Sequence, residues 1–229
     1  DNGGWLSGFD PREVNNNYTE ANSWQYSFSF QQDIGGYMKM RGGPAALEKM
    51  LDGLFSASDQ TTGRNQSDIT GLIGQYAQGN EPSHHVTYLY DYVGQPWKTQ
   101  FYVSKVLREL YNNSFSGYSG NEDCGQMSSW YIFSAMGFYP VNPASGKYEI
   151  GSPVLKSATI HLANGKTFKM TAKNVSDQNF YIQSVKLNGK PYNKPYILHS
   201  DIEKGATLDF VMGDKPNKKW GQDLNGLND

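Results

Sequence analysis

The hydrophobic pattern of this 229-residue chain changes near residue 140, and the change limits the folds that the chain can adopt. Before that point, apolar residues recur at helical spacing in segments separated by glycine-rich loops. After it, short alternating segments are separated by turn residues, which is typical of paired strands. The length suits one large domain or two small ones. We therefore predict an α+β fold, with a helical part over residues 1–140 and a β-rich part over residues 141–229.

Helical spacing is clearest in residues 96–111, where one face is apolar and the other carries Lys98, Lys105, Arg108 and Glu109. Residues 127–136 are apolar nearly all round, so a helix there needs other helices around it. Weaker signals complete the helical part. The predicted helices are residues 44–57, 68–77, 83–92, 96–111 and 127–136.

The β-rich part shows two turn signals between strand-like segments. Asn164-Gly165 separates residues 157–162 from 167–172, and Asn188-Gly189 follows residues 180–187. Residues 196–199 and 206–212 add further strands. These segments predict an antiparallel β module, a sandwich or part of one. The polar tail from Lys215 to Asp229 is expected to be only loosely ordered.

Composition excludes some classes of function. The net charge is −2, with no run of basic residues, so no nucleic-acid partner is expected. No stretch is long enough for a transmembrane segment. Aromatic residues make up 14% of the chain, which suits binding of sugars. The single cysteine, Cys124, excludes an internal disulfide. Because the chain begins at Asp1 without a signal-peptide pattern, we expect it to be a fragment of a longer protein.

The segment Gly120–Tyr131 places two adjacent carboxylates among amides and glycines, directly before an apolar helix. Such groups hold a hard cation, activate a water molecule or bind sugar hydroxyls. A simple helix cap, made by Asn121 or Asp123, is an equally good explanation. With no cluster of cysteine and histidine, a metal held here would be calcium bound by oxygen atoms, although the spacing alone does not imply calcium.

A second candidate segment is Tyr18–Tyr26, in which Glu20 lies near Trp24 and Tyr26. Aromatic neighbours that bury a carboxyl group raise its pKa, which is what a general acid requires near neutral pH. Alternatively, Glu20 is an exposed residue before an extended segment, because the aromatic residues from Trp24 to Phe30 alternate.

The third candidate segment is Gly79–His85, which contains Asn80, Glu81 and two adjacent histidines. Neighbouring residues on a helix point about 100° apart, so His84 and His85 do not form the i, i+4 pair of a zinc site. Polar contacts to a ligand and burial as packed histidines both remain open. The chain has neither a phosphate-binding glycine loop nor a GxSxG motif.

These motifs, in this order, resemble the glycoside hydrolase family 92 α-mannosidases over essentially the whole chain. The matching segments are Trp5 with Phe9-Asp10-Pro11, Tyr18–Tyr26, Gly79–His85, Gly94–Gln100, Gly120–Tyr131, Gly137–Pro140 and Lys186–Gly189. The resemblance implies calcium-dependent, exo-acting removal of mannose with inversion. It also implies an N-terminal β-sandwich domain and a C-terminal (α/α)6 barrel, of which this chain matches the C-terminal portion with its associated β structure.

By the same resemblance, Glu20 matches the general acid and Asp123 the general base that activates water. Many members have an aspartate where this chain has Asn121; because an amide is no base, the role falls on Asp123 alone. Asn80 and Glu81 match a segment lining the subsite of the leaving-group sugar, where some α-1,2-specific members have His-Glu, so the linkage is open. Expected substrate-binding residues are Asn80, Glu81, His84, His85 and Trp24, and expected metal ligands for Ca2+ are Asn121, Glu122 and Gln126.

The resemblance implies an α-1,2-mannosidase-like enzyme acting on mannose-containing glycans, in the bacterial periplasm or secreted to the cell surface. Its partners would be the upstream sandwich and the rest of the barrel in the same protein, so the isolated chain is expected to be inactive. Two alternatives stay open. One is a non-catalytic carbohydrate-binding or structural module, and the other is a different (α/α)6-barrel carbohydrate enzyme, which chelator sensitivity would separate.

Overall fold

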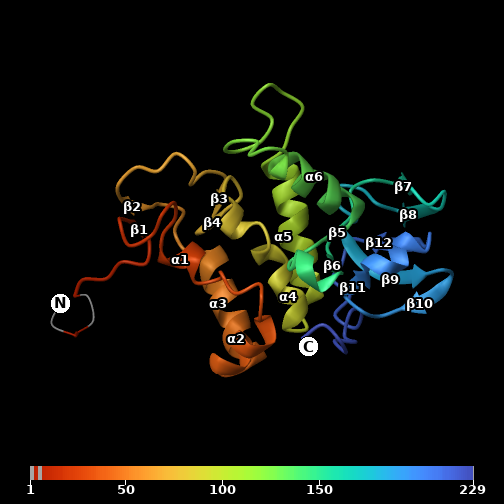
Figure 1. Ribbon diagram of the computed structural model, residues 1–229, viewed down its shortest axis with the longest axis horizontal. Coiled ribbons are helices and arrows are strands. Elements are labelled where there is room, and N and C mark those ends of the chain that lie inside the picture. The colour runs from red at the N-terminus through yellow and green to blue at the C-terminus, as the bar shows by residue number, and fades with distance from the viewer. Residues whose placement is uncertain (1–2, 5–6, 229) are drawn as a thin grey trace.

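The computed structural model describes residues 3–4 and 7–228, so Trp5 of the first matching segment lies outside the described residues. The chain forms a helical part and a β-rich part, with α5 running between them (Figure 1). The connection from α5 to α6 projects beyond both parts. The mixed helix-and-strand class expected from the sequence is confirmed.

The helices are α1 (Ser23–Tyr26), α2 (Ile34–Met40), α3 (Pro44–Ser56), α4 (Leu89–Tyr92), α5 (Pro96–Glu109), α6 (Gln126–Met136) and α7 (His199–Glu203), with 3₁₀ helices η1 (Glu81–Ser83), η2 (Val86–Tyr88) and η3 (Pro143–Ser145). The strands are β1 (Glu13–Val14), β2 (Thr62–Gly63), β3 (Leu72–Ile73), β4 (Tyr76–Ala77), β5 (Phe138–Tyr139), β6 (Lys147–Ile150), β7 (Ser157–His161), β8 (Thr167–Lys173), β9 (Tyr181–Leu187), β10 (Lys190–Tyr192), β11 (Tyr196–Leu198) and β12 (Thr207–Gly213).

Three predicted helices are confirmed as α3, α5 and α6. Both α3 and α5 begin with proline, whose missing N–H is no loss in the first turn. Helix α6 ends where Gly137 takes a left-handed φ of 98°, and the Gly137 N–H donates to the carbonyl oxygens of Phe133 and Ser134. Local signals were sufficient to place these helices.

Two expectations for the helical part are wrong. Residues 68–77 form the β3–β4 hairpin, in which Gly74 has a φ of 61° and would bring an added Cβ within 2.3 Å of the Leu54 carbonyl oxygen. This close approach of backbones selects a turn over a helix. The segment 83–92 is not one helix, because it breaks into the end of η1, then η2 and α4.

The alternation from Trp24 to Phe30 does not produce an extended segment, because Ser23–Tyr26 is helix α1. A capping box starts this helix: Asn22 Oδ1 accepts from the Gln25 N–H at 3.3 Å, and Gln25 Oε1 accepts from the Asn22 N–H at 2.8 Å. The reciprocal pair satisfies backbone donors that would otherwise be free at the helix start.

The β-rich part contains a five-stranded sheet in the order β10-β9-β12-β8-β7 and a three-stranded sheet in the order β11-β6-β5. The Asn164-Gly165 and Asn188-Gly189 turns lie where predicted, and Asn188 and Gly189 have φ angles of 51° and 77°. The prediction of a purely antiparallel module is wrong at one pair. The connection from β9 returns through β10, β11 and α7, which places β12 between β9 and β8, parallel to β8.

Two clusters of buried apolar side chains fill the molecule. One packs α2, α3, α4 and α5 with Trp130 of α6, and the other packs the five-stranded sheet against the three-stranded sheet. The polar tail is not loosely ordered as predicted, because Trp220 and Leu227 are buried in these clusters. The indole N–H of Trp220 donates to the Tyr192 carbonyl oxygen at 3.0 Å.

Within the described residues, no helix is both long and apolar enough to span a membrane. The longest, α5, has 14 residues and a polar face that includes Lys105 and Glu109.

Candidate active site

Glu20, Glu81 and Asp123 are far apart in the sequence, but in the fold Glu20 and Asp123 lie close enough to Glu81 to affect its pKa. Burial raises the pKa of Glu81, and the side chain of Asp123, within hydrogen-bonding range, and the charge of Glu20 raise it further. A carboxyl group whose pKa is raised by burial and by neighbouring carboxyl groups is a common feature of sites for acid–base chemistry. The fold therefore gathers the predicted acid, the predicted base and Glu81 into one site.

Glu20 lies in the bend before α1, and its surroundings differ from the expectation. Its carboxylate is exposed rather than covered by aromatic rings. The half-buried ring of Trp24 lies against α3, where an added Cβ on Gly53 would be 3.4 Å from it. The ring of Tyr26 packs against Tyr18, with 5.1 Å between the ring centroids. Both rings are turned to other partners and do not cover the carboxyl group of Glu20, whereas burial raises the pKa of Glu81.

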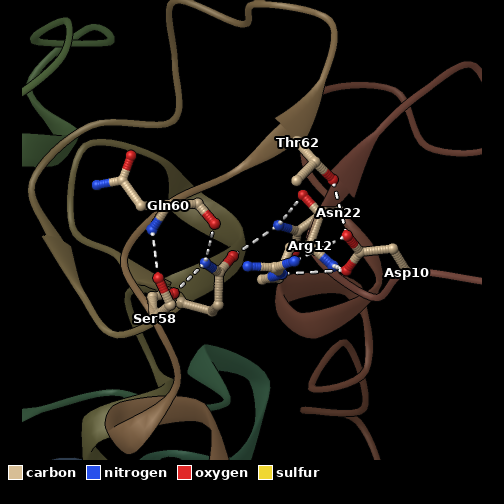
Figure 2. A network of polar contacts seen from close by, with 7 residues as sticks. Asp10, Arg12, Asn22, Ser58, Gln60 and Thr62 are labelled. Atoms are coloured by element: carbon tan, nitrogen blue, oxygen red, sulfur yellow. Dashed lines mark hydrogen bonds and ion pairs between the residues drawn. The ribbon is translucent and has the colours of Figure 1, made fainter.

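A buried polar network holds the segment that carries Glu20 (Figure 2). Asn22 and Gln75 are fully buried, and Asn22 Nδ2 donates to Gln75 Oε1 at 2.8 Å. Gln75 Nε2 in turn donates to the carbonyl oxygens of Ser58 at 2.6 Å and Gln60 at 3.3 Å. Buried amides are expensive to leave unpaired. The position of Asn22, two residues after Glu20, is therefore determined by distant parts of the chain.

The same network continues to the segment before Glu20. Asp10 accepts from Arg12 Nε and Nη2, both at 3.1 Å, and from the Thr62 hydroxyl at 3.0 Å (Figure 2). The hydrogen bonds from Arg12 lower the pKa of Asp10 to about 2. Asp10 thus stays ionised at neutral pH, and the contacts that join it to β2 persist.

Arg64 supplies a direct hold on the backbone next to Glu20. Its Nη2 lies 3.0 Å from the carbonyl oxygen of Thr19 and 3.5 Å from that of Tyr18. Because guanidinium groups are only donors, these contacts fix the two carbonyl groups that precede Glu20. Contacts before and after Glu20 in the sequence therefore position the backbone from which its side chain extends.

Asp123 lies in a backbone conformation that few residues adopt. Asp123, Cys124 and Gly125 have φ angles of 51°, 56° and 98°, so three successive residues are left-handed. Each non-glycine residue in this region costs about 1–2 kcal/mol. Such strain persists where the surrounding structure demands it, commonly at sites that must hold a side chain in one direction.

Glu122 caps the start of helix α6. Its Oε1 accepts from the Ser128 N–H at 3.1 Å, and its Oε2 accepts from the Ser128 hydroxyl at 2.9 Å. These bonds and one from Tyr118 lower the pKa of Glu122, which therefore sits as a charge beside the positive end of the helix. Both carboxylate oxygens thereby accept hydrogen bonds from Ser128, and the assignment of Glu122 as a metal ligand stays a prediction.

The other two expected calcium ligands also have separate partners. Asn121 Nδ2 reaches Asp68 Oδ1 at 3.5 Å, and Gln126 Nε2 contacts His84 and Tyr139. Across residues 3–4 and 7–228, no three side chains of His, Cys, Asp or Glu gather in a way that could hold a metal ion. These contacts engage the amide nitrogens of Asn121 and Gln126, and the assignment of Asn121, Glu122 and Gln126 as calcium ligands stays a prediction.

His84 and His85 are buried and use both ring nitrogens within the protein. His84 Nε2 lies 2.8 Å from the Gln78 carbonyl oxygen, and His85 Nε2 lies 2.7 Å from that of Phe28. Because a carbonyl only accepts, each Nε2 carries the hydrogen, and each Nδ1 accepts from a glutamine amide. Burial lowers the pKa of both rings to about 4, so both are neutral at pH 7. This arrangement favours holding the loop over contacting a sugar.

Asn80, by contrast, has an unused donor. Its side chain is 4% exposed, and its Nδ2 has no hydrogen-bond partner among the described residues. It directly precedes Glu81, the carboxyl group with the raised pKa. A buried amide without a partner is costly, and a ligand oxygen would relieve that cost. This supports the predicted substrate-binding role of Asn80.

An open groove of about 420 Å³ lies beside the Asp123 turn, between the α5–α6 connection and α6. Its walls are mainly the rings of Tyr111, Tyr118 and Tyr131 with the side chain of Ile132. Tyr118 bonds to Glu122, which joins this groove to the helix cap.

Sequence reasoning missed several residues that shape the site. Gln75 and Arg64 belong to no motif, and no local signal could have paired them with the Glu20 segment. The capping box of Asn22 and Gln25 was readable, because a capping residue is followed three positions later by glutamine.

Comparisons with known proteins agree with this picture. Residues 1–214 match the family model described as the glycosyl hydrolase family 92 catalytic domain. An uncharacterized secreted glycosidase of Arthroderma benhamiae is 31% identical over 213 residues, which cover 91% of this chain and 25% of that protein.

Two solved structures from Bacteroides thetaiotaomicron are also similar. A family GH92 α-mannosidase superposes with a TM-score of 0.87 at 41% identity, covering 97% of this chain and 29% of that one. A family GH92 inverting mannosidase superposes with a TM-score of 0.83 at 38% identity, covering 97% of this chain and 31% of that one. This chain thus spans between a quarter and a third of the length of these relatives.

Proposed function

This chain belongs to glycosyl hydrolase family 92, and we propose that the longer protein containing it removes terminal α-linked mannose from glycans. The observation that carries the proposal is the meeting of Glu20, Glu81 and Asp123 in one site. The similar structures from B. thetaiotaomicron, named as mannosidases, support the choice of sugar.

We propose an inverting mechanism, as the name of one of these relatives states for that enzyme. Glu20 gives a proton to the glycosidic oxygen as the bond to the leaving sugar breaks. Asp123 takes a proton from the water molecule that attacks the anomeric carbon from the opposite face. An inverting pair of this kind is typically about 6.5–9.5 Å apart, to leave room for the water. The strained turn under Asp123 suits a base whose direction must be maintained.

Glu81 and Asn80 are proposed to bind the leaving-group sugar. A carboxyl group with a raised pKa can donate a hydrogen bond to a sugar hydroxyl, and the Asn80 amide adds a second donor. An α-1,2 linkage stays a proposal, because the pair here is Asn-Glu.

Calcium stays a proposal for the longer protein only. The side-chain oxygens of Asn121 and Gln126 would be its ligands from this chain, while Glu122 also caps helix α6 through Ser128. We also propose that the protein is exported, to the periplasm or the cell surface. The secreted relative from A. benhamiae supports export.

The test is mannose release by the full-length protein from a panel of α-linked mannobioses, followed by NMR of the first anomer formed. We expect the β-anomer of mannose first, because inversion reverses the configuration of an α-linkage. Glu20→Gln and Asp123→Asn should each lower kcat by at least about 10²-fold, which is the range expected for a general acid or base. The isolated 229-residue chain should show little or no turnover.

Glu203→Gln and Asp177→Asn are matched controls, because both carboxylates are exposed in the β-rich part. They should leave kcat unchanged. Full activity of Glu20→Gln and Asp123→Asn would show that the acid and base are assigned wrongly. Activity that survives a calcium chelator would remove calcium from the proposal and leave the acid–base assignment standing.

A further inference from the structure

Two short turns carry the carboxylates of Glu81 and Asp123, and a hydrogen bond between His84 and Gln126 joins the turns beyond these residues. The backbone N–H of His84 donates to the Glu81 carbonyl oxygen at 3.0 Å, and that of Gln126 donates to the Asp123 carbonyl oxygen at 3.2 Å. Gln126 Nε2 lies 2.9 Å from His84 Nδ1. The bond thus connects the residues that lie three positions beyond each carboxylate.

The direction of this bond is determined by its surroundings. His84 Nε2 must carry the ring hydrogen because it faces the Gln78 carbonyl oxygen, so Nδ1 is an acceptor. Gln126 Nε2 also contacts the Tyr139 hydroxyl at 3.2 Å, so both of its hydrogens have partners. An amide with both hydrogens engaged holds one orientation.

His84 is anchored to α6 by its backbone as well. The indole N–H of Trp130 donates to the His84 carbonyl oxygen at 2.9 Å. Trp130 is fully buried and His84 is 2% exposed. The imidazole of His84 is therefore held beside Gln126, and it links the position of α6 to that of the Glu81 turn.

The two turns also touch directly through glycine backbones. An added Cβ on Gly120 would lie 2.5 Å from the Gly79 carbonyl oxygen. This contact brings the turns together before Glu81 and Asp123, and the His84–Gln126 bond joins them after these residues. A left-handed pair such as Asp123 and Cys124 persists only where the surrounding contacts hold it. Glu122 caps the start of α6 from within the same turn, and the His84–Gln126 bond ties that start to the Glu81 turn.

We propose that His84 is a positioning residue whose bond to Gln126 sets Asp123 against Glu81, and that it does not contact the sugar. The inference rests on the proposed function. It explains why a histidine with no free ring nitrogen lies three residues after Glu81.

Two variants of His84 separate its two ring nitrogens. In His84→Asn the amide oxygen takes the place of Nδ1, so the acceptor for Gln126 stays and the donor to Gln78 is lost. In His84→Gln the amide nitrogen takes the place of Nε2, so the donor stays and the acceptor is lost. Both variants lose the ring and one hydrogen bond, so a purely structural role would affect them alike.

The measurement is kcat and KM of both variants in the full-length protein, with the midpoint of urea unfolding for each. We expect His84→Gln to lose about 10²-fold in kcat, because small misplacements of reacting groups cost this much, with KM little changed. His84→Asn should keep most of its kcat. Equal kcat values for the two variants would overturn the proposal.

Gln126→Met keeps His84 and removes the amide that donates to it. This variant therefore tests the positioning role even if both His84 variants fail to fold. It should lower kcat as His84→Gln does, and wild-type kcat in Gln126→Met would overturn the proposal. Asp123→Asn, assayed in parallel, keeps the two ideas apart. If Asp123→Asn is fully active, the proposed mechanism fails; if it is inactive while Gln126→Met is fully active, only the positioning role fails.

Discussion

Asp91→Asn tests a buried acid in the middle of the helical part. Asp91 lies on α4, is fully buried, and has no hydrogen-bond partner for either carboxyl oxygen among the described residues. The Thr99 hydroxyl lies close to it but not in bonding geometry. Burial therefore raises the pKa of Asp91 well above its usual range, and the charge of Glu149 raises it further.

The sign of the effect follows from proton binding. The unfolded chain releases the Asp91 proton near its ordinary pKa of about 3.9, whereas the folded chain keeps it to a higher pH. The stability that Asp91 contributes is thus fully present below about pH 4 and is lost as pH rises toward the folded-state pKa. One proton of difference changes the free energy of unfolding by about 1.4 kcal/mol per pH unit.

Asparagine has nearly the same shape and does not titrate, so Asp91→Asn removes this slope. For each pH unit between the unfolded and the folded pKa of Asp91, the wild-type chain should lose about 1.4 kcal/mol more stability than the variant. Because the charge of Glu149 acts on Asp91, the two groups titrate as a coupled pair, and the difference between the two chains reports the loss of Asp91 together with this coupling. The raised pKa also makes the variant more stable at neutral pH.

Urea unfolding of both chains at several pH values between about 5 and 7 provides the measurement. Asp177→Asn is the control, because that side chain is 95% exposed and its loss should leave the slope unchanged. A constant offset between wild type and Asp91→Asn would report only how well the amide fits. Parallel curves would refute the reasoning, because Asp91 would then titrate like a solvated aspartate.

Three further variants test the framework of the site. Gly120→Ala should destabilise the chain by about 2 kcal/mol or more in urea unfolding, because the new Cβ meets the Gly79 carbonyl oxygen. Gly125 is also left-handed but has open space around it, so Gly125→Ala should destabilise the chain less. Trp130→Ala should lower the free energy of unfolding by about 3–5 kcal/mol in the same assay, since the indole is fully buried. A smaller loss would mean that neighbouring side chains move in to fill the cavity. Glu122 stabilises the wild-type chain when it is ionised, and this stability is lost as pH falls through its lowered pKa. Glu122→Gln should remove this pH-dependent stability. Identical acid unfolding of both chains would contradict the capping role.

The elements that sequence reasoning placed well are those with local causes. Helix α5 follows from its apolar stripe and Pro96, and the Asn188-Gly189 turn follows from the left-handed φ angles that these residues tolerate. The helix predicted for residues 68–77 was wrong because the β3–β4 hairpin depends on contact between Gly74 and the end of α3. The end of α3 lies outside the segment from which the helix was predicted.

The candidate site divides in the same way. Glu20, Glu81 and Asp123 stand out by motif and by resemblance to a family, so residue type and order along the chain are sufficient to name them. The burial expected at Glu20 was wrong, because the rings of Trp24 and Tyr26 have distant partners. A helix cap was expected from Asn121 or Asp123, but the bonds to Ser128 show that Glu122 makes it.

The sequence by itself determined the family, the change from helices to strands and the identity of the candidate acid and base, because these depend on residue type and on spacing along the chain. Only the tertiary structure decided that the pKa of Glu81 is raised and that His84 is turned toward Gln126. Burial and charge–charge interactions depend on distance in space, and the partners here lie 42 residues apart for His84 and Gln126.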